Sequence, residues 1–216
     1  MQINVDLHVH SDRSHDSSIT VLEAVAVARR RGLQGIAITD HDAATMIAQY
    51  SASDFLLVPG IEVSTSEGHL LGIGVDQSIP SGLPASETAD RIRETGGLAV
   101  VAHPFSSMAH KIDQRIIEKG RFNAIEVMNA SYPLFQRSSR LGRDLAERLD
   151  LPQVGGSDSH ILETIGDAFT VIEAESLTVE GVLKAIRNKK AHPEGRASSL
   201  TNQLKKAFSM LRLRLR

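Results

Sequence analysis

The sequence predicts an α/β protein built on a mainly parallel sheet, either a closed barrel or an open sheet with helices on both faces. Apolar runs rich in Val, Ile and Leu recur along the chain, and several are continuous, which is typical of parallel strands covered on both faces. Helical patterns lie between most of these runs. Polar segments rich in His, Asp and Glu follow several runs, at the strand ends where α/β proteins collect functional groups.

Eight apolar runs are expected to be strands, with five helices among them. The expected strands are residues 3–5, 36–38, 55–58, 70–73, 98–101, 124–127, 153–154 and 169–172. The expected helices are residues 20–31, 86–95, 112–119, 134–149 and 179–186. Thr20 and Glu23 form a capping-box pattern at the start of the first helix, and Gly32 ends it. The last helix has the clearest apolar stripe, at positions 179, 182, 183 and 186.

The composition is that of a globular protein without disulfides. The 216 residues are 41% hydrophobic and 23% charged, enough for one domain with a full core, and they include no Cys. Any bound metal must therefore be held by nitrogen and oxygen. No stretch approaches the length of a membrane span and the first residues lack the apolar run of a signal sequence, so a cytoplasmic location is expected.

Five short segments carry histidine or carboxylate residues, and each follows an apolar run. They are Asp6-Leu7-His8-Val9-His10, Ile38-Thr39-Asp40-His41, Gly60-Ile61-Glu62, Val101-Ala102-His103-Pro104 and Gly156-Ser157-Asp158-Ser159-His160. Alternate residues of a strand point to the same side, so His8 and His10 can reach one centre, and so can Asp158 and His160. Neutral imidazole and carboxylate oxygen are standard ligands of divalent transition metals. We therefore expect a metal site at one end of the sheet.

These segments resemble, in order and spacing, the motifs of the polymerase and histidinol phosphatase (PHP) family. The resemblance covers about residues 5 to 175. It implies a distorted seven-stranded β/α barrel of TIM-like type, two or three divalent metal ions (Mn, Zn, Fe or Mg) and hydrolysis of phosphoesters. Members of the family include histidinol-phosphate phosphatases, small-nucleotide phosphatases, exonucleases and domains attached to bacterial DNA polymerases.

The resemblance implies that Glu62 is shared between two metal ions. The first ion would be held by Glu62 together with His8, His10 and Asp158. The second ion would add His103. Two ions bridged in this way can clamp a phosphoryl group on both sides of an in-line displacement. Some relatives supply a further histidine to the second ion, but Leu134 stands near that place here, and Glu126, Asn129 or water are the alternatives.

A third ion would be held by His41, His160 and a residue just after the first motif. Asp16 is favoured for that place over His15, because hard cations prefer oxygen ligands. Asp40 and His160 are the two candidates for relaying a proton to the leaving oxygen.

Other residues are expected around the metals or away from them. Asp6 is expected to orient a ligand histidine from outside the metal shell, with a plain strand-end acid as the alternative, and Asn129 is a second candidate for such a place. His69 begins an apolar run and is as compatible with a structural role as with a place in the site. His110 and His192 lack a motif and are expected at the surface.

The expected reaction is hydrolysis of a phosphomonoester of a small metabolite or nucleotide, by attack of a metal-bound hydroxide. The stretches between Glu62, His103 and Asp158 contain no obvious cap domain, so small phosphomonoesters and nucleic-acid ends could both reach the metals. The first alternative is an exonuclease or phosphodiesterase acting on RNA or DNA ends. The second is a non-catalytic PHP-like subunit, which is disfavoured because nearly all the ligands are present.

The last part of the chain has a different character. From residue 187 onward nine Lys and Arg residues stand against one acid, Glu194, in a chain of net charge −2. Apolar residues also recur there at helical spacing, at positions 204, 208, 211 and 215. We expect a phosphoesterase domain over residues 1–196 and a basic amphipathic tail over residues 197–216. Such a tail can dock on its own domain, join a partner, contact an anionic membrane or bind nucleic acid, although only 4% of residues are aromatic, few for base stacking.

Overall fold

The computed structural model describes residues 1–47, 50, 54–106 and 111–215. The strands are β1 (Gln2–Val9), β2 (Gly35–Ile38), β3 (Leu56–Thr65), β4 (Gly68–Ile73), β5 (Leu98–Val101), β6 (Ala124–Asn129), β7 (Gln153–Gly156), β8 (Ala168–Glu173) and β9 (Ala191–Gly195). The helices are α1 (Val21–Arg30), α2 (Ala85–Glu94), α3 (Gln114–Lys119), α4 (Phe135–Arg148), α5 (Val179–Arg187) and α6 (Leu200–Arg214). A short 3-10 helix covers Leu162–Thr164.

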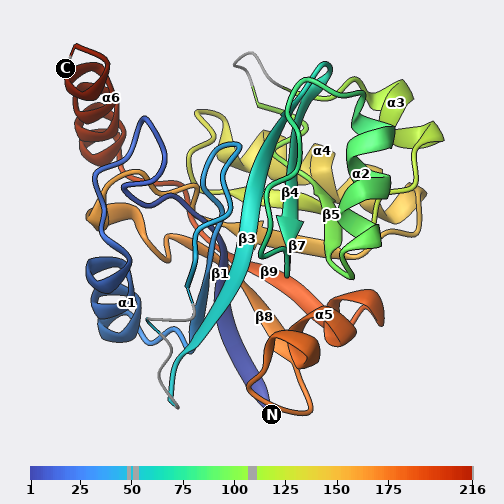
Figure 1. Cartoon of the computed structure of the whole chain (residues 1–216), viewed down its shortest axis with the longest axis horizontal. Helices are drawn as coiled ribbons and strands as arrows, with labels where there is room; N and C mark the ends of the chain where they lie inside the picture. The colour runs from blue at the N-terminus through green and yellow to red at the C-terminus, as the bar shows by residue number, and fades with distance from the viewer. Residues whose placement is uncertain (48–49, 51–53, 107–110, 216) are drawn as a thin grey trace.

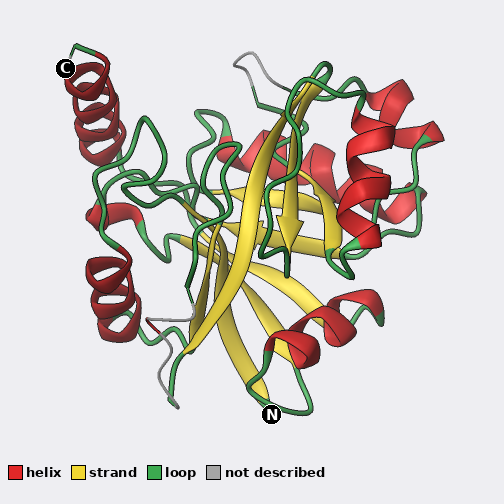
Figure 2. Cartoon of the chain, viewed as in Figure 1, coloured by secondary structure: helices red, strands yellow, loops and turns green. Residues whose placement is uncertain are grey.

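The strands form one curled sheet with helices around its outside (Figure 1, Figure 2). Within the described residues the sheet has nine strands, in the order β7-β6-β5-β4-β3-β2-β1-β8-β9. This nearly closed arrangement confirms the α/β barrel class that the sequence predicted, with nine strands in place of seven.

The expectation of a mainly parallel sheet is only half met. The pairs β1–β2, β2–β3, β5–β6 and β6–β7 are parallel, whereas β3–β4, β4–β5, β1–β8 and β8–β9 are antiparallel. Only Ser66 and Glu67 separate β3 from β4, and a link this short permits a hairpin but no parallel crossover. The unexpected strand β9 contains Pro193 and pairs only with β8 at the sheet edge, where a proline is tolerated.

The sheet closes where β1 meets the chain that follows β7. The amide of Asp158 donates to the carbonyl of His8 at 2.8 Å, and the amide of His10 donates to the carbonyl of Ser159 at 3.0 Å. Gly156 approaches β1 so closely that a Cβ at this position would lie 2.4 Å from the Cβ of His8. This contact, which we call the β1–β7 seam, brings the first and last polar motifs of the chain together.

Three apolar clusters place the site at one end of the barrel. One fills the barrel interior, where Leu7, Val58 and Val100 meet Val182 and Ile186 of α5. A second lies between the sheet and helices α2, α3 and α4, and a third lies between α1 and strands β1 to β3. Helix α5 thus covers one end of the interior, and the polar motifs gather at the other, where β1, β2, β5 and β7 end.

The helices largely follow their sequence signals. Helix α1 begins with the expected capping box, because the amide of Glu23 donates to Thr20 Oγ1 at 3.3 Å and the amide of Thr20 donates to Glu23 Oε2 at 3.0 Å. Helix α6 lies in the expected tail, and the domain boundary at residue 196 stays a prediction. None of the helices in the described ranges has the length and apolar character needed to cross a bilayer.

We expect Gly156→Ala to destabilise the protein by about 1–3 kcal/mol or more, because the new methyl group would push β7 away from His8. Gly82→Ala is the matched control. Its Cβ would meet nothing within 4 Å, so its cost is limited to backbone strain at a φ of +76°. Denaturant unfolding of both variants measures the difference, and equal stability of the two would contradict a tightly packed seam.

Candidate metal centre

The polar motifs come together at the rim of the barrel where β1, β2, β5 and β7 end. Most of these side chains are buried, His8 and His10 completely. Three groups place their ligand atoms within 4.8 Å of one another in the part of the chain that the structure describes. They are His10, Asp16, His41 and His160; His8, His10 and Glu62; and His41, Glu62 and His69.

Glu62 is the central member of this cluster. Its Oε2 lies 3.2–3.3 Å from a ring nitrogen of each of three histidines, His8, His10 and His41. Its Oε1 lies 2.9 Å from Nδ1 of His69 and 2.9 Å from Nε2 of His103. The two oxygens of one carboxylate thus face different sets of histidines, as a ligand shared between two cations would.

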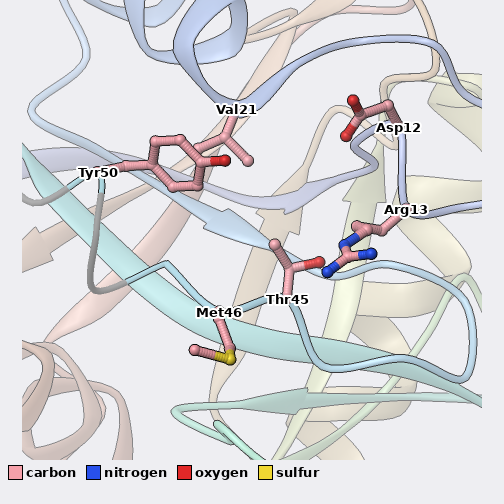
Figure 3. Close-up of a pocket in the computed structure, with 6 residues that line it drawn as sticks. All are labelled: Asp12, Arg13, Val21, Thr45, Met46 and Tyr50. Carbon is pink, nitrogen blue, oxygen red and sulfur yellow. The ribbon is translucent and has the colours of Figure 1, made fainter.

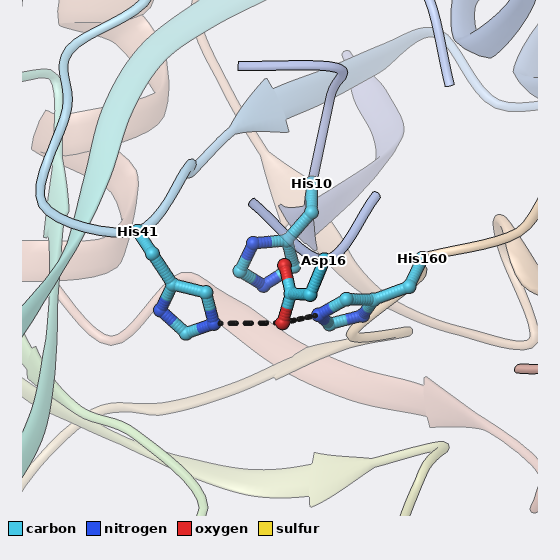
Figure 4. Close-up of side chains that lie close together, drawn as sticks. All are labelled: His10, Asp16, His41 and His160. Atoms are coloured by element: carbon cyan, nitrogen blue, oxygen red, sulfur yellow. Dashed lines mark hydrogen bonds and ion pairs between the residues drawn. The ribbon is translucent and has the colours of Figure 1, made fainter. Parts of the chain in front are cut away.

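Asp16 joins His41 to His160, as Figure 4 shows. Its Oδ2 lies 3.1 Å from Nε2 of His160 and 3.4 Å from Nε2 of His41. Its Oδ1 is buried and has no hydrogen-bond partner. His15, the competing residue, is exposed, although its ring lies beside that of His41, tilted by 36° with centroids 5.5 Å apart. The geometry therefore favours Asp16 for the third group.

Asp158 connects the remaining histidines across the β1–β7 seam. Its Oδ1 lies 3.5 Å from Nε2 of His10, 3.8 Å from Nε2 of His8 and 3.5 Å from Nδ1 of His160. Its backbone has a φ of +54°, in the left-handed region that aspartate tolerates better than most residues. The closure of the barrel thus fixes the direction of this carboxylate.

Glu126 contacts the outer side of the ligand set. Its Oε1 lies 2.9 Å from Nδ1 of His8, the ring nitrogen opposite to the one that faces Glu62. Its Oε2 accepts from the amide of His103 at 2.9 Å and from Nδ2 of Asn129 at 3.2 Å. A carboxylate in this place fixes the ring orientation of His8. The ligand role expected for Glu126 stays a prediction.

Asp6 contacts backbone amides rather than a histidine ring. Its Oδ1 accepts from the amides of His8 at 3.2 Å and Ser157 at 2.9 Å, and its Oδ2 accepts from the amide of Gly166 at 2.8 Å. Burial raises the pKa of this carboxyl to about 6, and these hydrogen bonds oppose the rise. Asp6 therefore ties β1 to the loops after β7, whereas Glu126 holds the imidazole.

Asp40 joins the loop after β1 to the loop after β2. It accepts from the amide of Ser11 at 2.5 Å, from Ser11 Oγ at 2.7 Å and from Thr45 Oγ1. Ser14 makes a similar link, because its Oγ lies 3.1 Å from Nδ1 of His10 and accepts from the amide of His41 at 2.9 Å. The proton-relay role expected for Asp40 stays a prediction, and its contacts favour a positioning role.

The close packing of carboxylates and imidazoles shifts their pKa values. Burial opposes the charged form of His41, but Glu62 and Asp16 outweigh burial and raise its pKa to about 9. Burial would raise the pKa of Glu62, yet the charges of His8 and His41 hold it well below its ordinary value. Burial, Lys206 and His10 lower the pKa of His160 to about 4, so its ring is neutral near pH 7.

The donor set fits divalent cations. It consists of imidazole nitrogen and carboxylate oxygen, which zinc and manganese accept. His160 is neutral, as a ligand must be, and Asp16 Oδ1 and His103 Nδ1 are buried without hydrogen-bond partners. The raised pKa of His41 shows that the carboxylates attract positive charge, which cations would supply in place of protons.

A cavity of about 320 Å³ is formed by the two loops that carry His10, Asp16 and His41 (Figure 3). Its lining residues are Asp12, Arg13, Val21, Thr45, Met46 and Tyr50. Asp12 and Arg13 lie between His10 and Asp16 in the chain, and Thr45 contacts Asp40, so the cavity lies on the same two loops as three of the candidate ligands, although none of its lining residues belongs to the three groups.

The sequence alone gives little indication of several residues of the site. The pattern around His69 is as compatible with a structural role as with a place in the site, and the structure brings it into the cluster beside Glu62. In the sequence Lys206 is one basic residue of the tail, and in the structure its Nζ lies 3.5 Å from Asp158 Oδ2. Ser14 lies between two motifs that carry ligands, and nothing else in the sequence indicates its contacts with His10 and His41. His192 is exposed as expected, and His110 lies outside the described residues.

Two protein families match this chain along most of its length. The PHP domain family matches residues 6–133, and the PHP-associated family matches residues 136–191. An uncharacterised protein of Methanocaldococcus jannaschii is 31% identical over 142 residues, which cover 59% of this chain and 82% of that protein. A 3',5'-nucleoside bisphosphate phosphatase of Chromobacterium violaceum is 35% identical over 86 residues, but the match covers only 36% of this chain and 30% of that protein.

Solved structures share the fold over nearly the whole chain. A two-domain protein from Bacteroides vulgatus, described as containing a predicted PHP-like metal-dependent phosphoesterase, superimposes with a TM-score of 0.67 and 19% identity, covering 97% of this chain and 70% of that one. Endonuclease Q in complex with a duplex containing an abasic lesion gives a TM-score of 0.66 and 17% identity, covering 99% of this chain and 72% of that one.

We expect the affinity for Mn or Zn to rise between pH 6 and pH 9, by up to about tenfold per pH unit, because a cation at His41 must displace the proton that its pKa of about 9 retains. Titration calorimetry in buffers of different ionisation enthalpy measures the released protons. His41→Gln is expected to weaken the pH dependence, and His192→Gln, at an exposed position, to leave it unchanged. Binding that is independent of pH would contradict the displacement.

Proposed function

Since this chain belongs to the PHP domain family and is a phosphoester hydrolase, we propose that it hydrolyses a phosphomonoester of a small metabolite or nucleotide. The observation that carries the proposal is the arrangement around Glu62, whose two oxygens face different histidines. A carboxylate shared in this way suits a pair of cations that together bind one phosphoryl group.

The residues that would hold the cations follow from the three groups together with the contacts of His103 and Asp158. Glu62 with His8, His10 and Asp158 would hold the first ion, and Glu62 with His69 and His103 the second. His69 thus offers a ligand for the second ion in place of the histidine that Leu134 replaces. Asp16, His41 and His160 would hold a third. Bound divalent ions supply an activated water and neutralise the phosphate oxygens.

The chain's own residues fix the geometry for this chemistry. Glu126 and Ser14 hold the outer nitrogens of His8 and His10, so that the opposite nitrogens of both rings face Glu62. Asp40 connects the loop after β1 to the loop after β2, because it accepts hydrogen bonds from Ser11 and Thr45. Ligands held by such outer contacts do not need to reorganise when a cation or a phosphate arrives.

The cavity beside the metal centre supports a small substrate. Its volume of about 320 Å³ lies at the lower end of the range for small-molecule sites. Arg13 offers a cation and Tyr50 an aromatic ring on its lining, which suits a polar or anionic group beyond the phosphate that is cleaved. The similarity to a 3',5'-nucleoside bisphosphate phosphatase is consistent with such a substrate.

A nuclease acting on RNA or DNA ends is the second candidate. Helix α6 contains Lys205, Lys206 and Arg212 and no acidic residue, and the fold is shared with endonuclease Q. Basic residues on one helix suit a phosphate backbone.

We expect Glu62→Ala to lose metal and activity together, with turnover reduced about 100- to 1000-fold, because the carboxylate that faces both sets of histidines would be lost. Phosphate release from nucleotides, phosphosugars, histidinol phosphate and short oligonucleotides, with added Mn or Zn, measures activity, and elemental analysis measures metal content. His192→Ala is the control, at an exposed position. Full activity in Glu62→Ala would exclude the bridging role.

The two candidate functions also differ in their response to salt. For a small phosphomonoester we expect KM to change by less than about tenfold between 50 and 200 mM salt, since few ions are displaced. A nucleic acid held through 6–10 phosphate contacts would lose affinity about 10³- to 10⁵-fold over the same range. Kinetics on the best substrate of each class, at both salt concentrations, decide between them.

A further inference from the structure

Helix α6 contacts the barrel through its lysines and leaves most of its large apolar residues in solvent. Lys205 Nζ lies 3.0 Å from Glu163 Oε1, and Lys206 Nζ donates to the carbonyl of Asp158 at 2.9 Å and to Ser131 Oγ at 3.0 Å. Five large apolar side chains of the helix and its C-terminal cap are 55% to 80% exposed, namely Leu200, Leu204, Phe208, Leu211 and Leu215, whereas Met210 and Leu213 are half-buried. An amphipathic helix ordinarily packs with the opposite face inward. The polar contacts of Lys205 and Lys206 at the rim therefore help to set the orientation of α6.

Lys206 lies next to a carboxylate of the metal centre. Its Nζ is 3.5 Å from Asp158 Oδ2, while Oδ1 of the same carboxylate lies 3.5 Å from Nε2 of His10. The side chain is 16% exposed, so the ammonium group is largely screened from bulk water yet reachable. Figure 1 shows α6 at the edge of the molecule, with the C-terminus at the end of the helix away from the barrel.

The two hydrogen bonds of Lys206 hold its ammonium group at the rim without neutralising its positive charge. Its acceptors at 2.9 and 3.0 Å are a carbonyl and a hydroxyl oxygen, both uncharged. The carboxylate that lies beside it among the described residues, Asp158, also faces three histidines and is expected to share its charge with a cation. With that charge shared, Lys206 offers an ammonium group to an anion that enters the site.

We propose that Lys206 contacts the substrate phosphate and favours dianionic phosphomonoesters over monoanionic phosphodiesters, so that α6 forms a wall of the active site. The inference rests on the proposed phosphoesterase function and deepens it. A terminal phosphate carries one negative charge more than a diester near neutral pH, and a lysine beside the cations adds more to the binding of the dianion. Lys205, the neighbouring lysine, contacts Glu163 instead and takes no part.

The test compares two chromogenic substrates, p-nitrophenyl phosphate and bis(p-nitrophenyl) phosphate, with the full-length metal-loaded protein. We expect Lys206→Gln to lower kcat/KM for the monoester about 10- to 100-fold and to change kcat/KM for the diester by less than about threefold. We expect Lys206→Arg to restore most of the preference. Lys205→Gln, on the same helix, is expected to keep the ratio of the wild-type protein.

Metal content, measured by elemental analysis, separates substrate contact from a structural role. If Lys206 only held Asp158 in place, Lys206→Gln would lose metal and both activities in parallel, and that result would overturn the proposal. An unchanged ratio with full metal content would overturn it as well. If the wild-type protein with Mn or Zn hydrolysed neither these two substrates nor those of the wider panel, the proposed function itself would fail, which is a different result from either.

Discussion

The metal centre depends on the burial of one carboxylate, Glu62, which is 1% exposed. Burying an ionised carboxylate is unfavourable unless opposite charge and hydrogen bonds compensate for the lost hydration. Here the compensation comes from five imidazole rings carried by β1, β4 and the loops after β1, β2 and β5, namely His8, His10, His41, His69 and His103. The barrel can enclose such a group only while positive charge, as protons or as cations, stays beside it. The stability of the fold and the binding of metal therefore both require positive charge beside Glu62.

The positions of most strands could be predicted from the sequence, but their directions could not. Strands β2 and β5 are buried at every residue, which is why continuous apolar runs identified them. An apolar run looks the same in a parallel and an antiparallel neighbour, and only the two-residue link Ser66-Glu67 distinguishes β3–β4 as a hairpin. Strand β9 has one buried residue, Pro193, and becomes a strand by pairing with β8 rather than through its own apolar pattern.

The ligand residues could be predicted, because strand ends in this architecture meet at one rim. The contacts that orient the side chains of these ligands could not be predicted. Glu126 lies 118 residues from His8, and nothing local shows that it holds that ring. The sequence pattern of α6 is compatible with several docking surfaces, and the structure places the side chain of Lys206, 16% exposed, against the rim while Leu204 and Phe208 stay exposed. The backbone of Asp158, at a φ of +54°, depends on the closure of the barrel and has no signature in the sequence.

The β1–β7 seam also determines when the site can first exist as the chain is synthesised. Asp6 and Ser157 are joined across 151 positions, and Asp16 and His160 across 144. The first four motifs therefore leave the ribosome well before the fifth, and contacts this distant in sequence make folding slow. A nascent chain that ends near residue 133 carries most of the imidazoles but no seam to hold them. The group of His10, Asp16, His41 and His160 can thus form only after the fifth motif has been synthesised.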